Sequence, residues 1–411
     1  MPVRIPSIKN LFRLETLIVL YFLVLLLFGK AFTKFSVIGP LYLHDAVLLL
    51  ITVLAINRGR LVSRFHAVWL LLAIAVLYLI LSLLFFHLHG PILLMAFRQF
   101  NLFLYMGCSL VIFNSTIRSG ADLPKLLRLI RLISILSIWL QIGLLINGFL
   151  FVPGFSLTGE TEYNYYSPLA VFGIITFGAI ALAYEKVAIR RWLKLMLALF
   201  LSTTTGHSSA FLAVVVIILV HFFMLIKPLQ RFIALGICLG VIVLLDLLPQ
   251  FRDVNASWRL LYWHHILDNI VFQHYLILGN GFGRPFMTSS FALYLNEVLH
   301  SPIMIDDLYP MATYLNPPHN SILTIMFHVG LLPALLLFVP LKKFFGQILL
   351  RSHSPDPGIN FLVYALAGCF VWIMFNVVLE LPHSATFFWL VYLTAAFALK
   401  MRGRPEPEAA E

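Results

Sequence analysis

Charged residues are scarce in this sequence: Asp, Glu, Lys and Arg make up 11% of its 411 residues, where a soluble domain has about 25%. That deficit excludes a soluble fold. Cysteine is scarcer still, with three in the whole chain, and Cys108, Cys238 and Cys369 all lie inside apolar stretches. The cysteines therefore form neither a disulfide framework nor a zinc site.

Apolar residues dominate instead, at 61% of the chain, and they gather in stretches long enough to cross a hydrocarbon core of about 30 Å. The sequence therefore predicts an all-α integral membrane protein with about 12 transmembrane helices. The predicted crossings are approximately residues 14–29, 37–56, 66–87, 91–114, 128–149, 167–185, 192–204, 208–226, 232–248, 320–345, 359–377 and 384–400. No A-x-A-like site follows the first stretch, so we expect it to be retained as an anchor.

The basic residues predict the orientation of these helices. Most of the 28 Lys and Arg fall in loops on one side of the membrane. These are Arg4, Lys9, Arg13, Arg58, Arg60, Arg64, Arg118, Lys125, Arg128, Arg131, Lys186, Arg190, Arg191, Lys194, Lys227, Arg231, Lys342, Lys343, Arg351, Lys400, Arg402 and Arg404. Because cytoplasmic loops accumulate Lys and Arg, both termini and these loops are predicted to be cytoplasmic. The net charge of +11 then reflects cationic loops and not a nucleic-acid partner.

One long loop divides the chain. Residues 1–248 hold crossings one to nine, residues 249–318 form an outer loop, residues 319–400 hold crossings ten to twelve, and residues 401–411 form a cytoplasmic tail. The outer loop is the only long segment of soluble composition. Its residues 257–272 are amphipathic, which predicts a helix lying on or just above the membrane.

A polar break at residues 202–209 separates two short apolar arms. Two crossings and a re-entrant hairpin both fit this pattern, and both leave the orientation of the remaining chain unchanged. Polar backbone at membrane depth is tolerated only where it is buried in protein or lines a cavity. The break is therefore predicted to form part of a cavity wall.

Charged residues inside the bilayer are few, and their cost makes them functional candidates. Arg98 lies about seven residues, or roughly 10 Å, below the outer end of its helix, and Asp45 lies at a similar depth. One interpretation is an Asp45–Arg98 ion pair that ties two helices together. The alternative is that Arg98 lines a cavity open to the outer leaflet and binds an anion, with Gln99 and Asn101 as polar neighbours.

The junction between the outer loop and the tenth crossing carries a histidine. Pro317 and Pro318 oppose helix formation, so we expect the helix to begin at His319–Asn320. The N–H groups and dipole of a helix N-terminus favour an anionic ligand and disfavour a protonated imidazole. A neutral His319 is suited to act as a general base near pH 7, although a cap or a solvated residue is the more ordinary role.

The histidines elsewhere do not predict a metal site. His87 and His89 have no cysteine or carboxylate near them, and the His264–His265 pair has only Asp268 within a helical turn. Ordinary interfacial histidines are the better interpretation of both pairs.

The first outer loop, residues 29–36, contains no Asp or Glu. This argues against a metal-dependent lipid-phosphosugar transferase of the kind that carries acidic residues there. No cofactor is predicted either, since the G-x-G-x-G at residues 279–283 follows no strand and opens no dinucleotide-binding unit.

Three motifs occur along the chain: H-N-x-x-L…G-L-L from His319, R-x-x-x-W…G-x-G-F-G from Arg259, and a Gly159…Asn164 stretch ahead of Ala170. Together they resemble motifs of the O-antigen ligase and Wzy-type O-antigen polymerase superfamily of bacterial inner-membrane glycan transferases. Twelve crossings, cytoplasmic termini and a long loop before the tenth crossing also match that family.

The resemblance implies transfer of a glycan en bloc from undecaprenyl diphosphate to an acceptor hydroxyl at the periplasmic face of the bacterial inner membrane. The implied partners are the lipid-linked glycan, an acceptor glycan or lipid A core, the lipid bilayer and a chain-length regulator. Diphosphate is already a good leaving group, so catalysis needs arginines for the developing negative charge and a base for the acceptor proton. The residues expected to serve are His319 as the base, Arg259, Arg98 and Arg284 for the diphosphate, and Asn320, Trp263, His207 and Asn164 in support.

The sequence departs from that family at residues 207–210, which read His-Ser-Ser-Ala where Ser-Arg followed by Gly or Ala is common. Either Arg98 or Arg284 supplies the missing charge, His207 does part of the work, or the donor is held differently. This departure favours a repeat-unit polymerase of O-antigen or exopolysaccharide. A ligase onto lipid A core is the close alternative.

Two other classes are compatible with many apolar helices. A lipid-linked glycan flippase or transporter predicts inverted repeats with broken helices near the midplane, whereas the polar residues here collect at the outer face. A purely structural membrane subunit gives no reason for the placement of the arginines and histidines. A metal-independent inverting glycosyltransferase is therefore the favoured prediction.

Overall fold

The fold is described by a computed structural model. It covers residues 14–38, 41–58, 64–86, 88–117, 119–151, 168–205, 207–236, 254–272, 279–299 and 312–402. The elements in chain order are α2 (Leu14–Lys34), β1 (Ser36–Ile38), β2 (Leu41–Tyr42), α3 (Leu43–Arg58), α4 (His66–Phe85), α5 (Gly90–Thr116), η1 (Gly120–Asp122), α6 (Leu123–Phe151), α7 (Pro168–Tyr184), α8 (Ala188–Thr203), α9 (Ser208–Phe223), α11 (Val254–Phe272), α12 (Ser289–Leu299), α13 (Ala312–Leu315), α14 (Ser321–Val329), α15 (Leu331–Leu335), η3 (Val339–Leu341), α16 (Lys342–Leu350), α17 (Pro357–Phe375) and α18 (Pro382–Met401).

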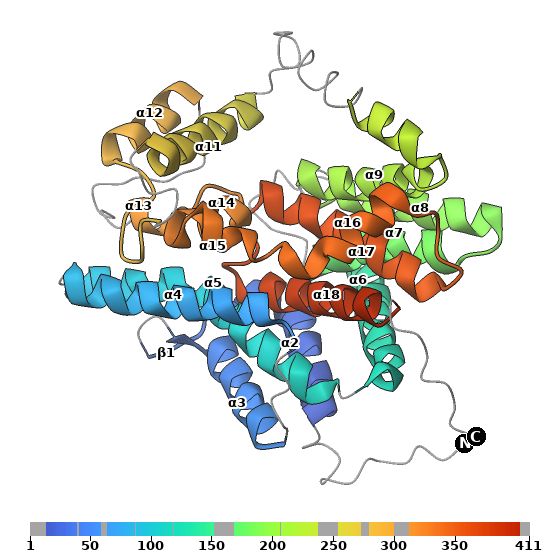
Figure 1. Cartoon of the computed structure of the whole chain (residues 1–411), viewed down its shortest axis with the longest axis horizontal. Helices are drawn as coiled ribbons and strands as arrows, with labels where there is room; N and C mark the ends of the chain where they lie inside the picture. The colour runs from blue at the N-terminus through green and yellow to red at the C-terminus, as the bar shows by residue number, and fades with distance from the viewer. Residues whose placement is uncertain are drawn as a thin grey trace.

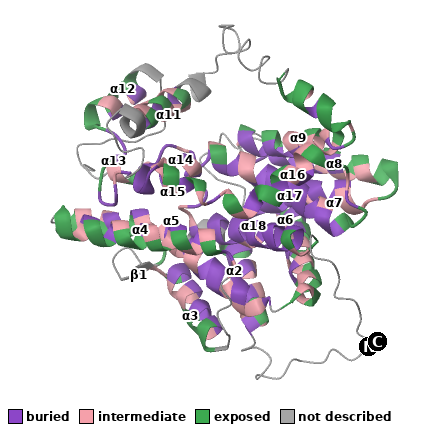
Figure 2. Cartoon of the chain, viewed as in Figure 1, coloured by how far each residue is buried: buried purple, intermediate pink, exposed green. Residues whose placement is uncertain are grey.

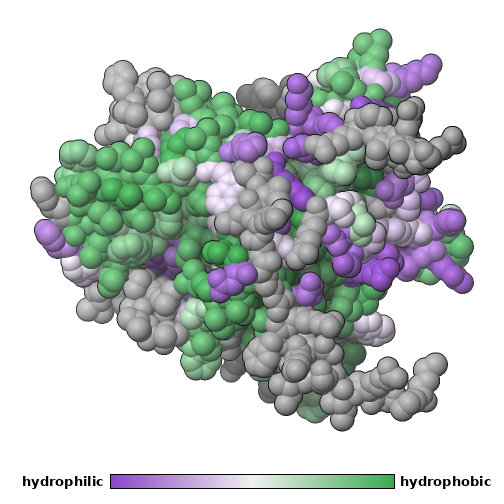
Figure 3. All heavy atoms as spheres, turned by 60° about the horizontal axis from the view of Figure 1, so that its bottom comes forward, coloured by the Kyte–Doolittle hydropathy of each residue, from purple (hydrophilic) through white to green (hydrophobic). Residues whose placement is uncertain are grey.

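The helices identify the chain as a helical membrane protein, as predicted. Among the described residues, six helices are long and apolar enough to cross a membrane: His66–Phe85, Gly90–Thr116, Gly120–Phe151, Leu331–Leu350, Pro357–Phe375 and Ser384–Met401. Shorter apolar helices occur at Leu14–Phe28, Leu43–Asn57, Leu169–Tyr184 and Ser208–Phe223. Figure 3 shows apolar side chains covering a broad area of one face and hydrophilic side chains gathered towards one end.

Helices α7, α17 and α18 form the centre of the bundle. Helix α7 packs against α6, α8, α9 and α17, and α18 packs against α2, α5 and α17. Figure 2 shows these central helices largely buried, whereas α4 exposes a long face. In Figure 1, α11 and α12 lie together at one end of the molecule, next to α13, α14 and α15, of which α14 and α15 also pack against α4 and α14 against α17.

Small residues let the central helices approach closely. A Cβ at Gly173 of α7 would collide with the Ser137 side chain of α6, and one at Gly368 of α17 would lie 2.6 Å from Ile175. The hydroxyls of Ser134 and Thr176 lie 2.6 Å apart across the same α6–α7 contact. Close contact between small residues and hydrogen bonds across helices are typical of association within a bilayer.

The second and tenth predicted crossings differ from the structure. Helix α3 begins at Leu43 rather than near residue 37, because β1 and β2 pair in antiparallel fashion over the preceding residues. The tenth crossing is broken at Gly330, whose φ of 86° is outside the helical region. The predicted break at residues 202–209 is confirmed, since α8 ends at Thr203 and α9 begins at Ser208.

Arg231 joins two helix ends. Its side chain is fully buried and donates to the carbonyls of Met224 and Ile226 after α9, and to those of Ile348 and Arg351 at the end of α16, over 2.7–2.9 Å. Helix C-termini leave carbonyls without intrahelical partners, and these carry partial negative charge. The guanidinium therefore satisfies the ends of both helices at once.

Candidate functional site

The site is built around the start of α14. Asn320 caps this helix, its side-chain oxygen accepting from the N–H groups of Ile322 and Leu323, each over 3.1 Å. The predicted helix start is therefore confirmed. His319 precedes the cap with a φ of 51°, and its N–H donates to the Pro317 carbonyl over 2.7 Å. A left-handed backbone costs an L-residue about 1–2 kcal/mol, and such strain clusters at functional sites.

Helix α11 brings Arg259 to this junction. Trp258, Tyr262 and Ile266 lie four residues apart on one face of the helix and are buried. They form a hydrophobic cluster with α12 and α14 whose other buried members are Phe286, Met287, Ala292, Leu295, Leu323 and Phe327. This second core fixes α11 against α14.

Two hydrogen bonds fix α11 to the segment before His319. The Trp263 indole N–H donates to the Pro318 carbonyl, and the Tyr262 hydroxyl donates to the Asn316 carbonyl, both over 2.6 Å. Residues four apart share a helix face, so Arg259 lies on the same face as Trp263. The arginine and tryptophan of the R-x-x-x-W motif therefore both lie beside His319.

His319 and Arg259 share one aromatic neighbour. The His319 imidazole packs edge-on against Trp258 with ring centroids 5.1 Å apart, and the Arg259 guanidinium carbon lies 5.2 Å from the Trp258 ring centroid. Burial lowers the pKa of His319 to about 4, helped by the charges of Arg259 and His207. The imidazole is consequently neutral at pH 7.

His207 lies at the N-cap of α9. Its ring packs edge-on against Trp372 with centroids 5.2 Å apart, and its charge contributes to the lowered pKa of His319. His207 thus belongs to the same electrostatic group. Asn164, also predicted as a supporting residue, lies outside the described residues.

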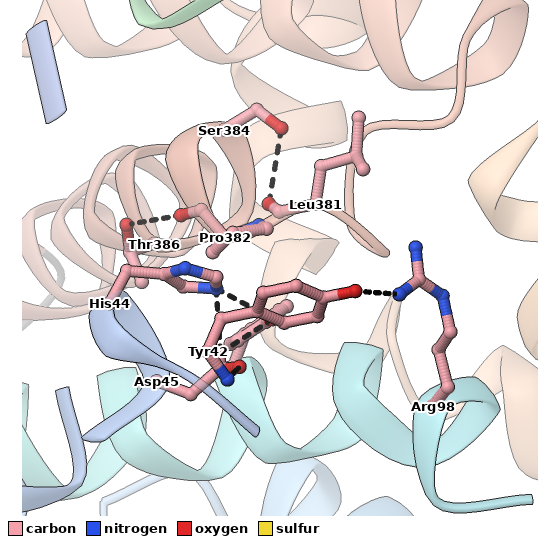
Figure 4. Close-up of polar contacts among 9 residues, drawn as sticks. Tyr42, His44, Asp45, Arg98, Leu381, Pro382, Ser384 and Thr386 are labelled. Atoms are coloured by element: carbon pink, nitrogen blue, oxygen red, sulfur yellow. Dashed lines mark hydrogen bonds and ion pairs between the residues drawn. The ribbon is translucent and has the colours of Figure 1, made fainter. Parts of the chain in front are cut away.

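Arg98 does not form the ion pair considered from the sequence. Its guanidinium donates to the Tyr42 hydroxyl over 2.8 Å, and Figure 4 shows it reaching across to that ring. In the part of the chain that the structure describes, the Asp45 carboxylate instead pairs with His44 Nε2 at 2.8 Å and accepts from the Tyr105 hydroxyl at 2.8 Å. Tyr42, predicted to lie in the crossing at residues 37–56, belongs instead to strand β2 and is the hydrogen-bond partner of Arg98.

Arg284 contacts a different part of the molecule. Its exposed guanidinium carbon lies 3.9 Å from the Phe86 ring centroid, just beyond the end of α4. Its backbone carbonyl accepts from the Gln99 side chain over 2.8 Å. Arg259 is therefore the only one of the three predicted diphosphate-binding arginines whose described contacts join it to the His319–Trp258 pair.

The G-x-G-F-G segment is a docking loop. Gly279, Gly281 and Gly283 have φ of 55°, 73° and 73°, a region in which L side chains are strained. The N–H groups of Asn280 and Gly281 donate to the Phe327 and His328 carbonyls over 2.7 and 3.0 Å. Those carbonyls belong to the last turn of α14, where helix carbonyls have no partner within the helix.

Two further N–H groups of this loop donate to side chains of α4 and α5. The Phe282 N–H donates to the Ser82 hydroxyl of α4 over 2.9 Å, and the Gly283 N–H donates to Gln99 of α5 over 2.8 Å. A phosphate-binding loop needs N–H groups that point at the ligand. The glycines here connect the outer segment to three helices instead.

Glu380 was not predicted from the sequence. It lies in the loop between α17 and α18, where its Oε2 accepts from the Ser321 hydroxyl over 2.6 Å. Burial raises its pKa. With Arg98 it lines a cavity of about 70 Å³ that lies against the start of α14; the other lining residues are Gln99, Phe286, Tyr314, Leu315, Pro317, Thr324, His328, Val377 and Leu381.

The two adjacent histidines of α11 have separate partners. His264 Nε2 lies 3.2 Å from Asp268, and His265 stacks on Phe291 with centroids 4.0 Å apart. Within the described residues, no group of three or more His, Cys, Asp and Glu is close enough to share a metal ion. Cys108 and Cys369 are buried free thiols, and Cys238 lies outside the described residues.

No model of a known protein family matches this chain, and no curated protein matches it in sequence. The site is therefore interpreted from its own geometry.

Proposed function

We propose that this protein is a metal-independent membrane glycosyltransferase that moves a glycan en bloc from undecaprenyl diphosphate to an acceptor hydroxyl. The observation that carries the proposal is a neutral imidazole beside a guanidinium, both held against Trp258 at a helix start. A base and a cation held against the same ring suit displacement of diphosphate by a hydroxyl, because one takes the acceptor proton and the other binds the leaving group. The proposal also agrees with the resemblance of the three motifs to O-antigen polymerases and ligases.

In the proposed reaction, the acceptor oxygen attacks the anomeric carbon of the donor. The bond from that carbon to the diphosphate oxygen breaks, and His319 takes the acceptor proton. Arg259 holds the diphosphate, which leaves with its negative charge balanced by the guanidinium; such pairs can be bidentate without a metal. Direct attack inverts the anomeric configuration.

The bound diphosphate also helps His319 to act as a base. A pKa of about 4 keeps the imidazole unprotonated but makes it a weak base in the free protein. A diphosphate bound beside Arg259 adds negative charge near the imidazole and raises its pKa towards the working pH. Donor binding would therefore prepare the base before the acceptor arrives.

The proposed orientation has twelve crossings, cytoplasmic termini and residues 249–318 in the periplasm, so that the site faces the periplasm from the inner membrane. The distribution of Lys and Arg supports this arrangement. Among the described residues, the six helices long and apolar enough to cross a membrane support this arrangement, and the four shorter apolar helices are compatible with it.

A transporter is the alternative that would use a broken helix in the membrane, and the tenth crossing is broken at Gly330. The carbonyls of Phe327 and His328 at this break accept from the glycine loop. They are thus already hydrogen-bonded, whereas a transporter uses such carbonyls to coordinate an ion. The break favours the enzyme over the transporter.

Reconstitution tests the proposal. Purified protein in lipid, given a lipid-linked glycan donor and excess chelator, should transfer glycan, and His319→Ala should not. Loss of activity with EDTA and its return with magnesium would contradict the arginine mechanism.

Analysis of surface polysaccharide from a deletion strain distinguishes polymerase from ligase. For the favoured polymerase, single repeat units should remain on the lipid A core or the lipid carrier. Normal chain length with polymer accumulating on undecaprenyl diphosphate would instead identify the ligase.

A further inference from the structure

The cavity between Arg98 and Glu380 presents a buried hydrogen-bond acceptor from α14. The Nδ1 of His328 lies 2.8 Å from the Gly281 carbonyl. A carbonyl can only accept, so Nδ1 carries the proton and Nε2 of the neutral ring is an acceptor. His328 is fully buried and lines the cavity, and its Nε2 has no hydrogen-bond partner among the described residues.

Glu380 supplies a second acceptor on the same cavity. Its Oε2 is occupied by the Ser321 hydroxyl, whereas its Oε1 is buried and has no hydrogen-bond partner within the described segments. The neighbouring Thr324 hydroxyl lies 3.1 Å from the Asn320 carbonyl and is also close enough to the Glu380 carboxylate to lower its pKa. Buried acceptors without partners are uncommon and indicate a missing donor.

The rest of the cavity is suited to a sugar. Arg98 uses one N–H for the Tyr42 hydroxyl, and its guanidinium has five N–H donors in all. Phe286 and Tyr314 add aromatic surface. The cavity volume of about 70 Å³ is enough for several water molecules, since each water needs about 10–15 Å³.

The two acceptors select against phosphate. Phosphate oxygens would meet the lone pair of His328 Nε2 and the carboxyl oxygen of Glu380 without donating to either. A hydroxyl donates to such atoms and can accept from Arg98. The cavity therefore complements a polyhydroxylated ligand whose hydroxyls donate to the two acceptors and accept from Arg98.

We propose that this cavity is the acceptor subsite, in which Glu380 Oε1 and His328 Nε2 bind hydroxyl groups of the acceptor sugar. This inference rests on the proposed function. Pro317 and Thr324, which line the cavity, flank His319 and Asn320 in the chain, so the cavity adjoins the segment that carries the proposed base. Glu380 would then position the acceptor, and Arg259 the donor.

Binding can be measured without the natural acceptor. The full-length protein in detergent is mixed with methyl glycosides of glucose, galactose and N-acetylglucosamine, and binding is detected by saturation-transfer NMR. At least one glycoside should bind, and Glu380→Gln should weaken it about 10–100-fold, the effect of losing one hydrogen bond to a charged group. Inorganic pyrophosphate should not displace the glycoside.

Matched variants control for folding. Glu297→Gln removes an exposed carboxylate of α12 and should bind the glycosides normally. Tyr314→Ala opens the cavity wall without altering either acceptor and should also weaken binding, so the inference remains testable if Glu380→Gln is unstable. Glycoside binding that is unaffected by both cavity variants, or displaced by pyrophosphate, would overturn the subsite.

The transfer reaction separates this inference from the proposed function. Glu380→Gln should raise the KM for the acceptor about 10–100-fold and leave donor binding unchanged. If the parent protein transfers glycan and the variant has the parent's acceptor KM, the subsite is wrong and the function stands. If the parent neither binds nor transfers a lipid-linked glycan, the function is wrong, and the glycoside measurements still decide what the cavity binds.

Discussion

The edge of the His319 imidazole meets the Trp258 indole at a centroid distance of 5.1 Å. Trp258 also lies under the Arg259 guanidinium, so one buried ring positions both the proposed base and the proposed diphosphate-binding residue. An aromatic support of this kind holds two side chains from different segments at a fixed spacing without neutralising either.

The left-handed backbone of His319 gives the first prediction. His319→Gly removes the imidazole and suits the φ of 51°, so the variant should be at least as stable as the parent while losing about 10²–10⁴-fold in transfer rate. Imidazole added at millimolar concentration should restore part of the rate. Stability is read from thermal unfolding and activity from transfer of labelled glycan. A near-normal rate without imidazole would show that His319 is not the base.

The charge of Arg259 predicts that replacing this residue changes the pH dependence of the transfer reaction. Since the neutral imidazole is the base and its pKa is lowered to about 4, kcat/KM for the donor should fall as the pH drops through that value. Arg259→Gln removes a positive charge that lowers the pKa, so the acidic limb should move to higher pH, towards the ordinary value of 6.5.

Arg259→Lys is the matched control. It keeps the charge and should leave the acidic limb near its original pH, although a lysine cannot form a bidentate pair and donor affinity should still fall. If kcat/KM falls at the same acidic pH in the Gln and Lys variants, the charge of Arg259 does not set the pKa of His319.

The glycine loop predicts a strong effect on stability. A Cβ at Gly279 would lie 2.4 Å from the Gly330 backbone nitrogen and 2.6 Å from the His328 oxygen. Gly279→Ala should therefore destabilise the protein by about 2 kcal/mol or more, from backbone strain and collision together. Gly346→Ala in α16, where a Cβ meets open space, should be neutral or stabilising. Thermal unfolding of both variants in detergent would measure the difference.

Arg231 gives a prediction far from the site. Replacing it with methionine leaves four carbonyls at the helix ends without this donor, which should cost on the order of 3 kcal/mol. The nearby Lys227→Met removes an exposed charge and should change the melting temperature little. Equal melting temperatures for the two variants would mean that the buried guanidinium does not stabilise the helix ends.

Membrane orientation can be checked by thiol labelling. In a background lacking reactive cysteines, Ser289→Cys should react with an impermeant reagent added outside spheroplasts. Lys186→Cys and Lys343→Cys should react only after permeabilisation, because both lie in loops predicted to be cytoplasmic. Cytoplasmic labelling at position 289 would exclude a periplasmic site.

Local signals made part of this structure predictable. The start of α14 follows from two prolines and an asparagine cap, all adjacent in sequence. The membrane helices were also predictable, because each is a continuous run of apolar residues in the sequence. The pairing of Arg98 could not be obtained in this way, because its partner Tyr42 belongs to a short strand inside a stretch that reads as helix.

Glu380 was missed for a related reason. It is a single acid in a short loop between two apolar helices, and its link to the site is the Ser321 hydroxyl, which is distant in sequence. No spacing rule connects residues whose contact depends on how helices pack. The glycines of 279–283 were noticed, but their role as a docking loop required knowing that α14 ends at Val329.

The docking of the glycine loop constrains how the chain is assembled. Its partners are Ser82 and Gln99, made early in synthesis, and the carbonyls of Phe327 and His328, made after the loop itself. The glycine loop therefore cannot complete its contacts until the following helix has been made. During that interval the buried aromatic residues of the outer segment have no complete core, so biogenesis passes through an exposed intermediate that chaperones and proteases can reach.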